Sequence, residues 1–245
     1  MRIICLVPSL TELLFDLGLG DQIVGRTRFC IHPKEAVESA DIVGGTKNPN
    51  IERIKELRPD LIILNKEENR KEDAELLEQI ADLLVTDINT IDEALLAITE
   101  IAKRTQTAEA GLKLTTAIRT EVDKADMFDP ISAAYLIWKK PYMTVGGDTY
   151  IHDVMKKWGL KNVFADAERY PETTVEELRI KDPQLVLLSS EPYPFSAKHV
   201  QELDGQLGGP KSMLVNGEFF SWYGSRMLPA FRYLNRWRSE AESLL

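Results

Sequence analysis

The sequence predicts an α/β protein with two Rossmann-like lobes, each built on a parallel sheet, and a long backbone helix that joins them, with a ligand cleft between the lobes. Three observations carry this prediction: short apolar runs alternate with amphipathic segments, one set of motifs occurs twice, and a proline-free segment separates the two copies. Strands that alternate with helices are typical of parallel sheets. The predicted domains are residues 1–89, the connecting helix over 90–126, and residues 127–245.

The repeated motifs predict that the two lobes are related. Residues 7–19 and 147–160 each combine a loop, a helical pattern and a late glycine, which is Gly18 in one copy and Gly159 in the other. A second pair of segments follows, each with a short helical pattern, a proline and an apolar run. Two copies of one α/β unit imply a cleft between them.

The first lobe begins with a buried strand over residues 3–7, an apolar run that ends at a proline. Ser9 or Thr11 then caps a helix, and Gly18 terminates it. Residues 22–25 predict the second strand. The order strand, helix, strand is that of a βαβ unit, so these strands are expected to be parallel.

The later elements repeat this pattern around the connector. Asn50 caps a short helix, and an apolar strand follows over residues 61–64. Between 90 and 125 apolar residues recur at helical spacing without a proline, which predicts a helical connector. Because a helix of 20 residues is about 30 Å long, this connector is expected to be a stiff strut. A strand over 131–138 opens the second lobe, and a helix over 227–245 closes it.

Composition narrows the class of protein. The 245 residues are 44% hydrophobic with a mean hydropathy of −0.21. No apolar run approaches the roughly 20 residues that span a bilayer. A net charge of −9 with a pI near 5.0 disfavours nucleic-acid binding, which needs a basic face. We therefore expect no membrane insertion and no nucleic-acid partner, and we expect a monomer.

The two cysteines and the first residues bear on the cellular compartment. Cys5 and Cys30 provide no disulfide framework, and Cys5, in an apolar run, is expected to be a buried thiol. No secretory signal precedes the first strand as the sequence is written. The expected location is periplasmic or otherwise extracytoplasmic if a signal has been removed, and cytoplasmic if none was.

Loops after the predicted strands are rich in aromatic residues. Ligands of open α/β sheets bind beyond the carboxyl ends of the strands. The loops concerned are residues 25–33, 166–171, 193–195 and 219–226. Aromatic walls suit a large flat or apolar ligand, and Trp222 with Tyr223 is the strongest candidate. The alternative is that each ring folds back into the core of its own lobe.

Few residues suggest catalysis. The chain has no Gly-x-Ser-x-Gly elbow, no phosphate-binding Gly-x-x-x-x-Gly-Lys and no Gly-x-Gly-x-x-Gly after a strand. Cys30 and His32 are too few for a closed zinc site, which needs about four ligands. His32 can still supply one axial ligand to a metal that the cargo brings. We expect that the protein is not an enzyme. The alternative is a cytoplasmic corrinoid- or tetrapyrrole-handling protein or enzyme that uses Cys30 and His32.

Six motifs spread over nearly the whole chain are similar to those of one known family. They are Leu6–Glu12, Phe29–Pro33, Gly44-Gly45 with Asn50–Ile54, Leu57–Ile62, Thr90–Leu95 and Lys181–Val186. They resemble the helical-backbone, class III substrate-binding proteins of ABC importers for cobalamin and ferric siderophores. The resemblance implies a protein that needs no resident cofactor, binds a small-molecule metal chelate such as cobalamin or an Fe(III)-siderophore, and delivers it to an ABC permease.

The resemblance also implies a ligand-binding set. Phe29, Tyr170, Glu218 and Trp222 match aromatic or polar cleft positions of cobalamin binders, and Met143 stands where an aromatic residue is common. Thr46 and Asn65 stand where cobalamin binders often have tryptophan, which is a departure from that pattern. The complete expected set is Phe29, Cys30, His32, Thr46, Asn65, Met143, Tyr170, Glu218, Trp222 and Tyr223.

Four glutamates are candidates for contact with a partner protein. Glu67, Glu68 and Glu72 follow the strand over 61–64, and Glu191 follows its counterpart in the second lobe. The residues alone are consistent with solvated acidic loops or with a partner that carries arginines. The resemblance implies docking, because these positions correspond to the glutamates at the tips of the lobes that meet arginines of the permease.

Overall fold

The computed structural model describes residues 1–125, 128–209 and 211–242. The described chain divides into two compact units. The first unit consists of Met1–Ile88, Asp92–Ala117 and Tyr223–Met227, and the second unit contains the remaining described residues. No helix in the described residues is long and apolar enough to cross a bilayer.

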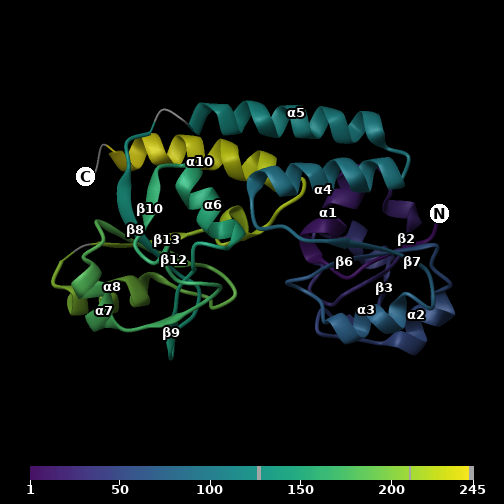
Figure 1. The fold of residues 1–245 in the computed structure, drawn as a ribbon, viewed down its shortest axis with the longest axis horizontal. Helices are drawn as coiled ribbons and strands as arrows, with labels where there is room; N and C mark the ends of the chain where they lie inside the picture. The colour runs from purple at the N-terminus through teal and green to yellow at the C-terminus, as the bar shows by residue number, and fades with distance from the viewer. Residues whose placement is uncertain (126–127, 210, 243–245) are drawn as a thin grey trace. The chain divides into compact units, whose positions relative to one another are not determined.

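The first unit is built on a five-stranded parallel sheet with the order β3-β2-β1-β6-β7. Its strands are β1 (Ile3–Cys5), β2 (Ile23–Arg26), β3 (Asp41–Ile42), β6 (Leu61–Asn65) and β7 (Asp82–Thr86), and its helices include α1 (Pro8–Asp16), α2 (Ile51–Leu57) and α3 (Lys71–Leu77). Every residue of β1 and β6 is buried because helices cover both faces. Figure 1 shows α2 and α3 on one side of this sheet and α1 on the other.

Short elements complete the first unit. They are the 3-10 turns η1 (Gly20–Gln22) and η2 (Ala36–Ser39) and the antiparallel pair β4 (Gly44–Gly45) and β5 (Asn48–Pro49). The core between the sheet and helices α2 and α3 contains Ile4, Leu6, Val43, Ile54, Ile62, Leu64 and Leu77. The candidate site begins in the loop that follows β2, where Arg28 and Phe29 are exposed.

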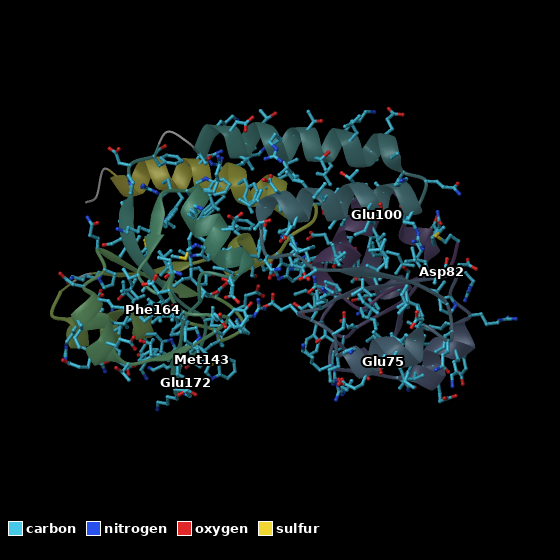
Figure 2. The ribbon with its side chains drawn as sticks, in the orientation of Figure 1. Glu75, Asp82, Glu100, Met143, Phe164 and Glu172 are labelled. Atoms are coloured by element: carbon cyan, nitrogen blue, oxygen red, sulfur yellow. The ribbon has the colours of Figure 1, made fainter. Side chains whose placement is uncertain are left out.

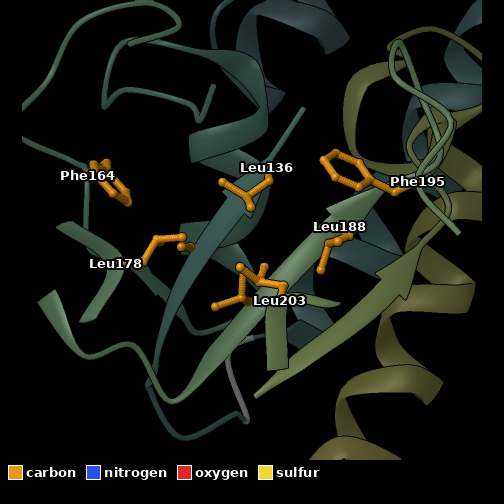
Figure 3. Close-up of a cluster of buried hydrophobic side chains, with 8 residues drawn as sticks. Leu136, Phe164, Leu178, Leu188, Phe195 and Leu203 are labelled. Atoms are coloured by element: carbon orange, nitrogen blue, oxygen red, sulfur yellow. The ribbon is translucent and has the colours of Figure 1, made fainter. Parts of the chain in front are cut away.

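The second unit has a four-stranded parallel sheet with the order β10-β8-β12-β13. Its strands are β8 (Ile131–Leu136), β10 (Leu160–Asn162), β12 (Leu185–Ser189) and β13 (Ser212–Val215), and its helices include α6 (Tyr150–Lys157), α7 (Val175–Lys181), α8 (Ala197–Leu207), α9 (Glu218–Ser221) and α10 (Met227–Glu242). Strands β9 (Tyr142–Met143) and β11 (Glu172–Thr173) form a separate antiparallel pair. Figure 3 shows the core of this unit, in which Leu136 and Leu188 from the sheet lie near Leu178 and Leu203 from the helices.

The two sheets confirm the predicted duplication. The order β2-β1-β6-β7 in the first unit has the same connectivity as β10-β8-β12-β13 in the second. Helices α2 and α7 both end at a left-handed residue, Arg58 (φ 46°) and Asp182 (φ 43°), and a proline follows each. Gly18 and Gly159 follow α1 and α6 with φ of 80° and 68°, a conformation that glycine adopts without a side-chain clash.

The predicted helix starts are partly wrong. Asn50 caps α2 as expected, because its Oδ1 accepts a hydrogen bond from the backbone N–H of Arg53 at 3.0 Å. Neither Ser9 nor Thr11 caps α1, which begins at Pro8 with Val7 as its N-cap. Proline suits the first position of a helix, so the predicted caps lie inside α1.

The predicted single connecting helix is also wrong. Residues 90–125 contain two helices, α4 (Ile91–Arg104) and α5 (Ala108–Lys124), and residue 126 lies outside the described residues. The backbone N–H and hydroxyl of Thr107 both donate to the carbonyl of Ala102, at 2.7 and 3.4 Å. A methyl group on Gly111 would lie 2.4 Å from the Cβ of Ala102. The chain therefore folds back, and α5 packs closely on α4.

Candidate ligand-binding site

The side chain of Arg26 supports the loop that follows β2. This side chain is only 8% exposed, and its guanidinium donates to three backbone carbonyls, of Val37 at 2.7 Å, Cys30 at 3.1 Å and Thr27 at 3.3 Å. Charge-assisted hydrogen bonds of this kind are stronger than neutral ones, so they fix the course of the loop. At the top of the loop Phe29 and Ile31, the latter not predicted from the sequence, are each 52% exposed.

Cys30 anchors this loop and is not accessible. Its Sγ lies 3.2 Å from the hydroxyls of both Thr11 and Thr27. Burial raises the pKa of the Cys30 thiol, and it raises the pKa of Cys5 to about 12. Both thiols are therefore protonated at neutral pH, and neither has the low pKa of a nucleophile or a metal-binding thiolate. The structure speaks against the expected contact between Cys30 and a ligand.

His32 ends the same loop and is half-buried. It lies near Glu12 of α1, where a positively charged His32 would lower the pKa of the Glu12 carboxyl. Within the described residues, no group of three or more His, Cys, Asp or Glu side chains is arranged to hold a metal ion. The axial role of His32 toward a metal in the cargo stays a prediction.

Asn65 and Asn69 shape the loop after β6. Asn65 is 1% exposed, and its Nδ2 donates to the Thr86 hydroxyl at 3.0 Å while its Oδ1 accepts from the backbone N–H groups of Glu67 and Glu68 at 2.8 and 3.3 Å. Asn69 accepts from the backbone N–H of Asn65 at 2.9 Å. The amide of Asn65 is used inside the protein, so the structure speaks against its predicted contact with a ligand.

Asn69 also reaches the neighbouring segments. Its Nδ2 donates to the carbonyl of Thr46 at 3.0 Å and to that of Leu6 at 3.3 Å. Thr46 is half-buried, and its backbone position is thereby fixed beside β1 and the loop after β6. Glu67 and Glu68 are half-buried on this fixed loop, whereas Glu72 is exposed in the first turn of α3.

In the second unit, Met143 and Tyr170 are brought to neighbouring segments. Met143 on β9 pairs with Glu172 on β11, and the backbone N–H of Thr144 donates to the carbonyl of Pro171, next to Tyr170, at 3.0 Å. Figure 2 labels Met143 and Glu172 close together. Both Met143 and Tyr170 are half-buried, and the Arg169 guanidinium lies 5.5 Å from the centre of the Tyr170 ring.

Trp138 was missed by sequence reasoning. Its carbonyl accepts from the backbone N–H of Met143 at 3.2 Å, its side chain is 40% exposed, and its ring packs edge-on against Tyr193 at 5.7 Å. Its position as the last residue of the predicted strand over 131–138 was the available signal, and β8 ends two residues earlier, at Leu136. By contrast Phe195, from the aromatic loop over 193–195, is buried in the core.

Helix α9 begins at Glu218, and Trp222 is its C-cap. They are one helical turn apart, since the backbone N–H of Trp222 donates to the carbonyl of Glu218 at 3.0 Å, and both side chains are half-buried. The Ser221 hydroxyl donates to Glu191 Oε1 at 2.7 Å, and a methyl group on Gly217 would lie 2.4 Å from Ser189 Oγ. The predicted docking residue Glu191 is therefore attached to the helix that begins at Glu218 and ends just before Trp222.

Tyr223 belongs to the first unit, together with the rest of residues 223–227. Arg226 forms a two-bond ion pair with Glu12, at 2.6 and 2.9 Å, and Gly224 (φ 93°) approaches the carbonyl of Ser9 so closely that a methyl group would lie at 3.1 Å. Tyr223 is buried, so it offers little surface to a ligand.

The expected site residues thus fall into two sets. The first unit contains Phe29, Cys30, His32, Thr46, Asn65 and Tyr223, and the second unit contains Met143, Tyr170, Glu218 and Trp222. In the first set, Phe29 is the side chain that combines exposure with a rigid support. In the second, Glu218 and Trp222 lie at the two ends of α9, and Met143 and Tyr170 lie near one edge of the β9–β11 pair.

Comparisons with known proteins give a consistent result. A sequence profile of the family described as "Periplasmic binding protein" matches residues 3–206. A vitamin B12-binding protein of Vibrio cholerae serotype O1 (strain M66-2) is 30% identical over 194 residues, which cover 77% of this chain and 70% of the relative. One of Vibrio campbellii is 26% identical over 210 residues, covering 83% and 73%.

Solved structures agree on the fold. The periplasmic vitamin B12 binding protein BtuF of Vibrio cholerae superimposes with a TM-score of 0.83 at 25% identity, covering 98% of this chain and 97% of that one. The periplasmic haem-binding protein RhuT of Roseiflexus sp. RS-1 gives a TM-score of 0.84 at 19% identity, with 98% of each chain covered. At that lower identity the likeness concerns the fold alone.

Proposed function

This chain belongs to the periplasmic binding protein family, in its helical-backbone class III, and from that membership we propose that it binds a bulky metal chelate and delivers it to an ABC importer. The proposed cargo is a corrinoid, with a ferric siderophore as the other member of the expected class. The proposed location is outside the cytoplasm, where such binding proteins meet their permeases.

The observation that carries this proposal is the 30% identity to proteins named vitamin B12-binding protein over 77% of this chain. The geometry of the two residue sets supports it. Phe29 and Ile31 on the first unit and Trp138 on the second present exposed apolar surface at the carboxyl ends of strands. Such surfaces suit a large ligand, because flat rings bury much area while a few polar groups fix its orientation.

Binding without catalysis is favoured over the alternative use of Cys30 and His32. A nucleophilic cysteine has a lowered pKa and an accessible sulfur. Cys30 has neither property, because it is fully buried and its pKa is raised. For docking on a permease, Glu72 is the best placed of the four glutamates, since it is exposed on α3, whereas Glu191 is bonded to Ser221.

The proposal is tested by absorbance titration of the protein with cobalamin, haem and a ferric siderophore. We expect a stable complex with cobalamin whose spectrum returns to that of free cobalamin when the protein is denatured. Trp222→Ala should weaken this complex by about 1–3 kcal/mol if the ring packs on the cargo. Leu112→Ala, at an exposed position of α5, is the matched control and should change nothing. A protein that binds none of the three, or that converts one chemically, would contradict the proposal.

A further inference from the structure

One cation, Arg28, lies beside the exposed ring of Phe29, and a second, Lys47, lies in the turn between β4 and β5. The guanidinium carbon of Arg28 lies 5.5 Å from the centre of that ring, and its Nη2 donates to Asn48 Oδ1 at 3.3 Å. Lys47, the neighbour of Asn48, is exposed, and its Nζ donates to the backbone carbonyl of Glu67. Across the part of the chain that the structure describes, neither cation has a carboxylate partner.

Gly45 allows these groups to meet. A methyl group there would lie 2.4 Å from Asn48 Oδ1, 3.1 Å from Arg28 Nη2 and 3.3 Å from Cε2 of Phe29. The backbone N–H of Arg28 also donates to the carbonyl of Gly44 at 2.9 Å, which ties the loop to the β4–β5 pair. Arg28 is therefore held in one place by the ring, the amide and its own backbone.

Four other cations of the first unit are paired with carboxylates. Each of these side chains lies within 4 Å of a carboxylate. The pairs are Arg53 with Asp41, Lys55 with Glu52, Lys66 with Asp87 and Arg70 with Asp73. In a chain with a net charge of −9, such partners are abundant. The ordered guanidinium of Arg28 has no carboxylate partner in the described part of the chain and lies over an exposed aromatic ring, so it is suited to bind an external anion. Arginine binds carboxylate and phosphate groups through two parallel hydrogen bonds.

We propose that Arg28, assisted by Lys47, binds a carboxylate or phosphate group of the cargo, while the Phe29 ring contacts the apolar part of the same molecule. This inference rests on the proposed function, which it extends by naming an anionic cargo. The anion has two chemical sources among bulky chelates, namely the carboxylate side chains of a tetrapyrrole and the phosphodiester of a corrinoid. Gly45 is expected to be required as well, because any side chain there would displace the guanidinium.

The test uses two matched pairs of ligands, with the dissociation constant as the readout. Haem and its dimethyl ester differ in their carboxylates, and cobalamin and cobinamide differ in the phosphodiester with its nucleotide. In one of the two pairs, we expect Arg28→Gln to weaken binding of the ligand that carries the anion about tenfold, which is the effect of losing one charge-assisted hydrogen bond. Binding of the ligand that lacks the anion should not change. Lys47→Gln should act in the same direction by about threefold. The pair that responds identifies the source of the anion.

Lys34→Gln is the control, since Lys34 is an exposed cation in the same segment between β2 and η2. It should leave all affinities unchanged, and the thermal midpoint of each variant should match that of the wild type because these side chains are exposed. An equal loss for both members of each pair, or no loss, would overturn the anion site and leave the proposed function standing. A wild-type protein that binds none of the four ligands would overturn the proposed function, and this inference with it.

Discussion

Strands β6 and β12 occupy equivalent positions in the two sheets, and all five residues of each are buried, but the loops that follow them are held in different ways. The loop after β6 is closed by the amides of Asn65 and Asn69, which bond to backbone groups of the same unit. The loop after β12 is closed by hydroxyls, with Ser189 bonded to Glu191 and Ser190 Oγ accepting from the backbone N–H of Gly217 at 2.9 Å.

This difference shows where two copies of one unit have diverged. The sheet is retained, because a strand buried on both faces tolerates little besides apolar residues. The loops are free to change, since they lie at the surface. In the first unit the loop is held by its own asparagines, and it contacts Lys47 through the carbonyl of Glu67. In the second it shares a hydrogen bond with α9, which begins at Glu218 and is capped by Trp222. A change in the second loop is therefore expected to reach candidate ligand residues directly.

The largest expected effect is that of Asn65→Ala. The substitution leaves the backbone N–H groups of Glu67 and Glu68 and the buried hydroxyl of Thr86 without their amide partner. Because unsatisfied buried polar groups are destabilising, the free energy of unfolding should fall by about 3 kcal/mol. Urea unfolding at neutral pH measures it. A loss below about 1 kcal/mol would mean that water replaces the amide and that the first loop is not self-supporting.

Ser189→Ala is the counterpart in the second unit. Ser189 Oγ accepts from the buried hydroxyl of Tyr135 at 3.1 Å and from the backbone N–H of Glu191 at 3.3 Å. Its removal should lower the free energy of unfolding by about 2 kcal/mol, less than Asn65→Ala, because fewer groups lose a partner. The same urea titration applies. A loss larger than that of Asn65→Ala would reverse the comparison between the two loops.

Much of the fold could be predicted from local patterns. The buried runs of β1 and β6 and the recurrence of a late glycine at Gly18 and Gly159 gave the parallel sheets and the duplication. The break between α4 and α5 could not be predicted, since Thr105-Gln106-Thr107 contains neither glycine nor proline. It depends on the contact of Gly111 with Ala102, which exists only once the chain has folded back.

The site was less predictable, because its supports either bind backbone carbonyls or join residues that are far apart in the sequence. Phe29 was identified as an aromatic residue in a loop after a strand. The residues that hold its loop were not, because Arg26 binds backbone carbonyls, which carry no sequence signal. Arg226 and Glu12 are 214 residues apart. Asparagine is common in turns, so the sequence does not distinguish Asn69 from other turn residues. Its supporting role is evident only from its hydrogen bonds to the carbonyls of Leu6 and Thr46.

The units also differ in how they hold a carboxyl group. Burial raises the pKa of Glu12 in the first unit, and the Arg226 guanidinium opposes this only in part. Burial also tends to raise the pKa of Glu121 in the second unit, but hydrogen bonds from Lys124 and Asn235 outweigh this effect. The pKa of Glu121 therefore lies below the usual value of 4.5. The two carboxyl groups should therefore contribute to stability with opposite dependence on pH.

Glu121→Gln should lower the free energy of unfolding by about 1 kcal/mol at pH 7, because the exposed ends of Lys124 and Arg232 screen the ion pairs. The contribution of Glu121 is complete above its unfolded-state pKa, and it is lost as the pH falls through its lower folded-state pKa. The contribution of Glu12 is complete below 4.5 and is lost as the pH rises through its higher folded-state pKa. Unfolding of both Gln variants from pH 3 to 7 checks the two signs, and equal slopes would contradict the assignment.

The smallest expected effect is the most informative about the second loop. Ser221→Ala removes the hydroxyl that donates to Glu191 Oε1, and it leaves the backbone of α9 intact. The free energy of unfolding should fall by only about 0.5–1 kcal/mol, because the carboxylate of Glu191 is half-buried and can turn toward water.

The affinity for the proposed cargo should nevertheless fall about threefold, because Glu191 no longer fixes the helix that ends next to Trp222. Calorimetric titration of Ser221→Ala alongside Ser239→Ala, whose hydroxyl bonds only to a carbonyl of α10, separates this effect from the general loss of a serine. An unchanged affinity in both variants would show that α9 is positioned by its own packing. In that case the two loops would differ in structure but not in their relation to the ligand.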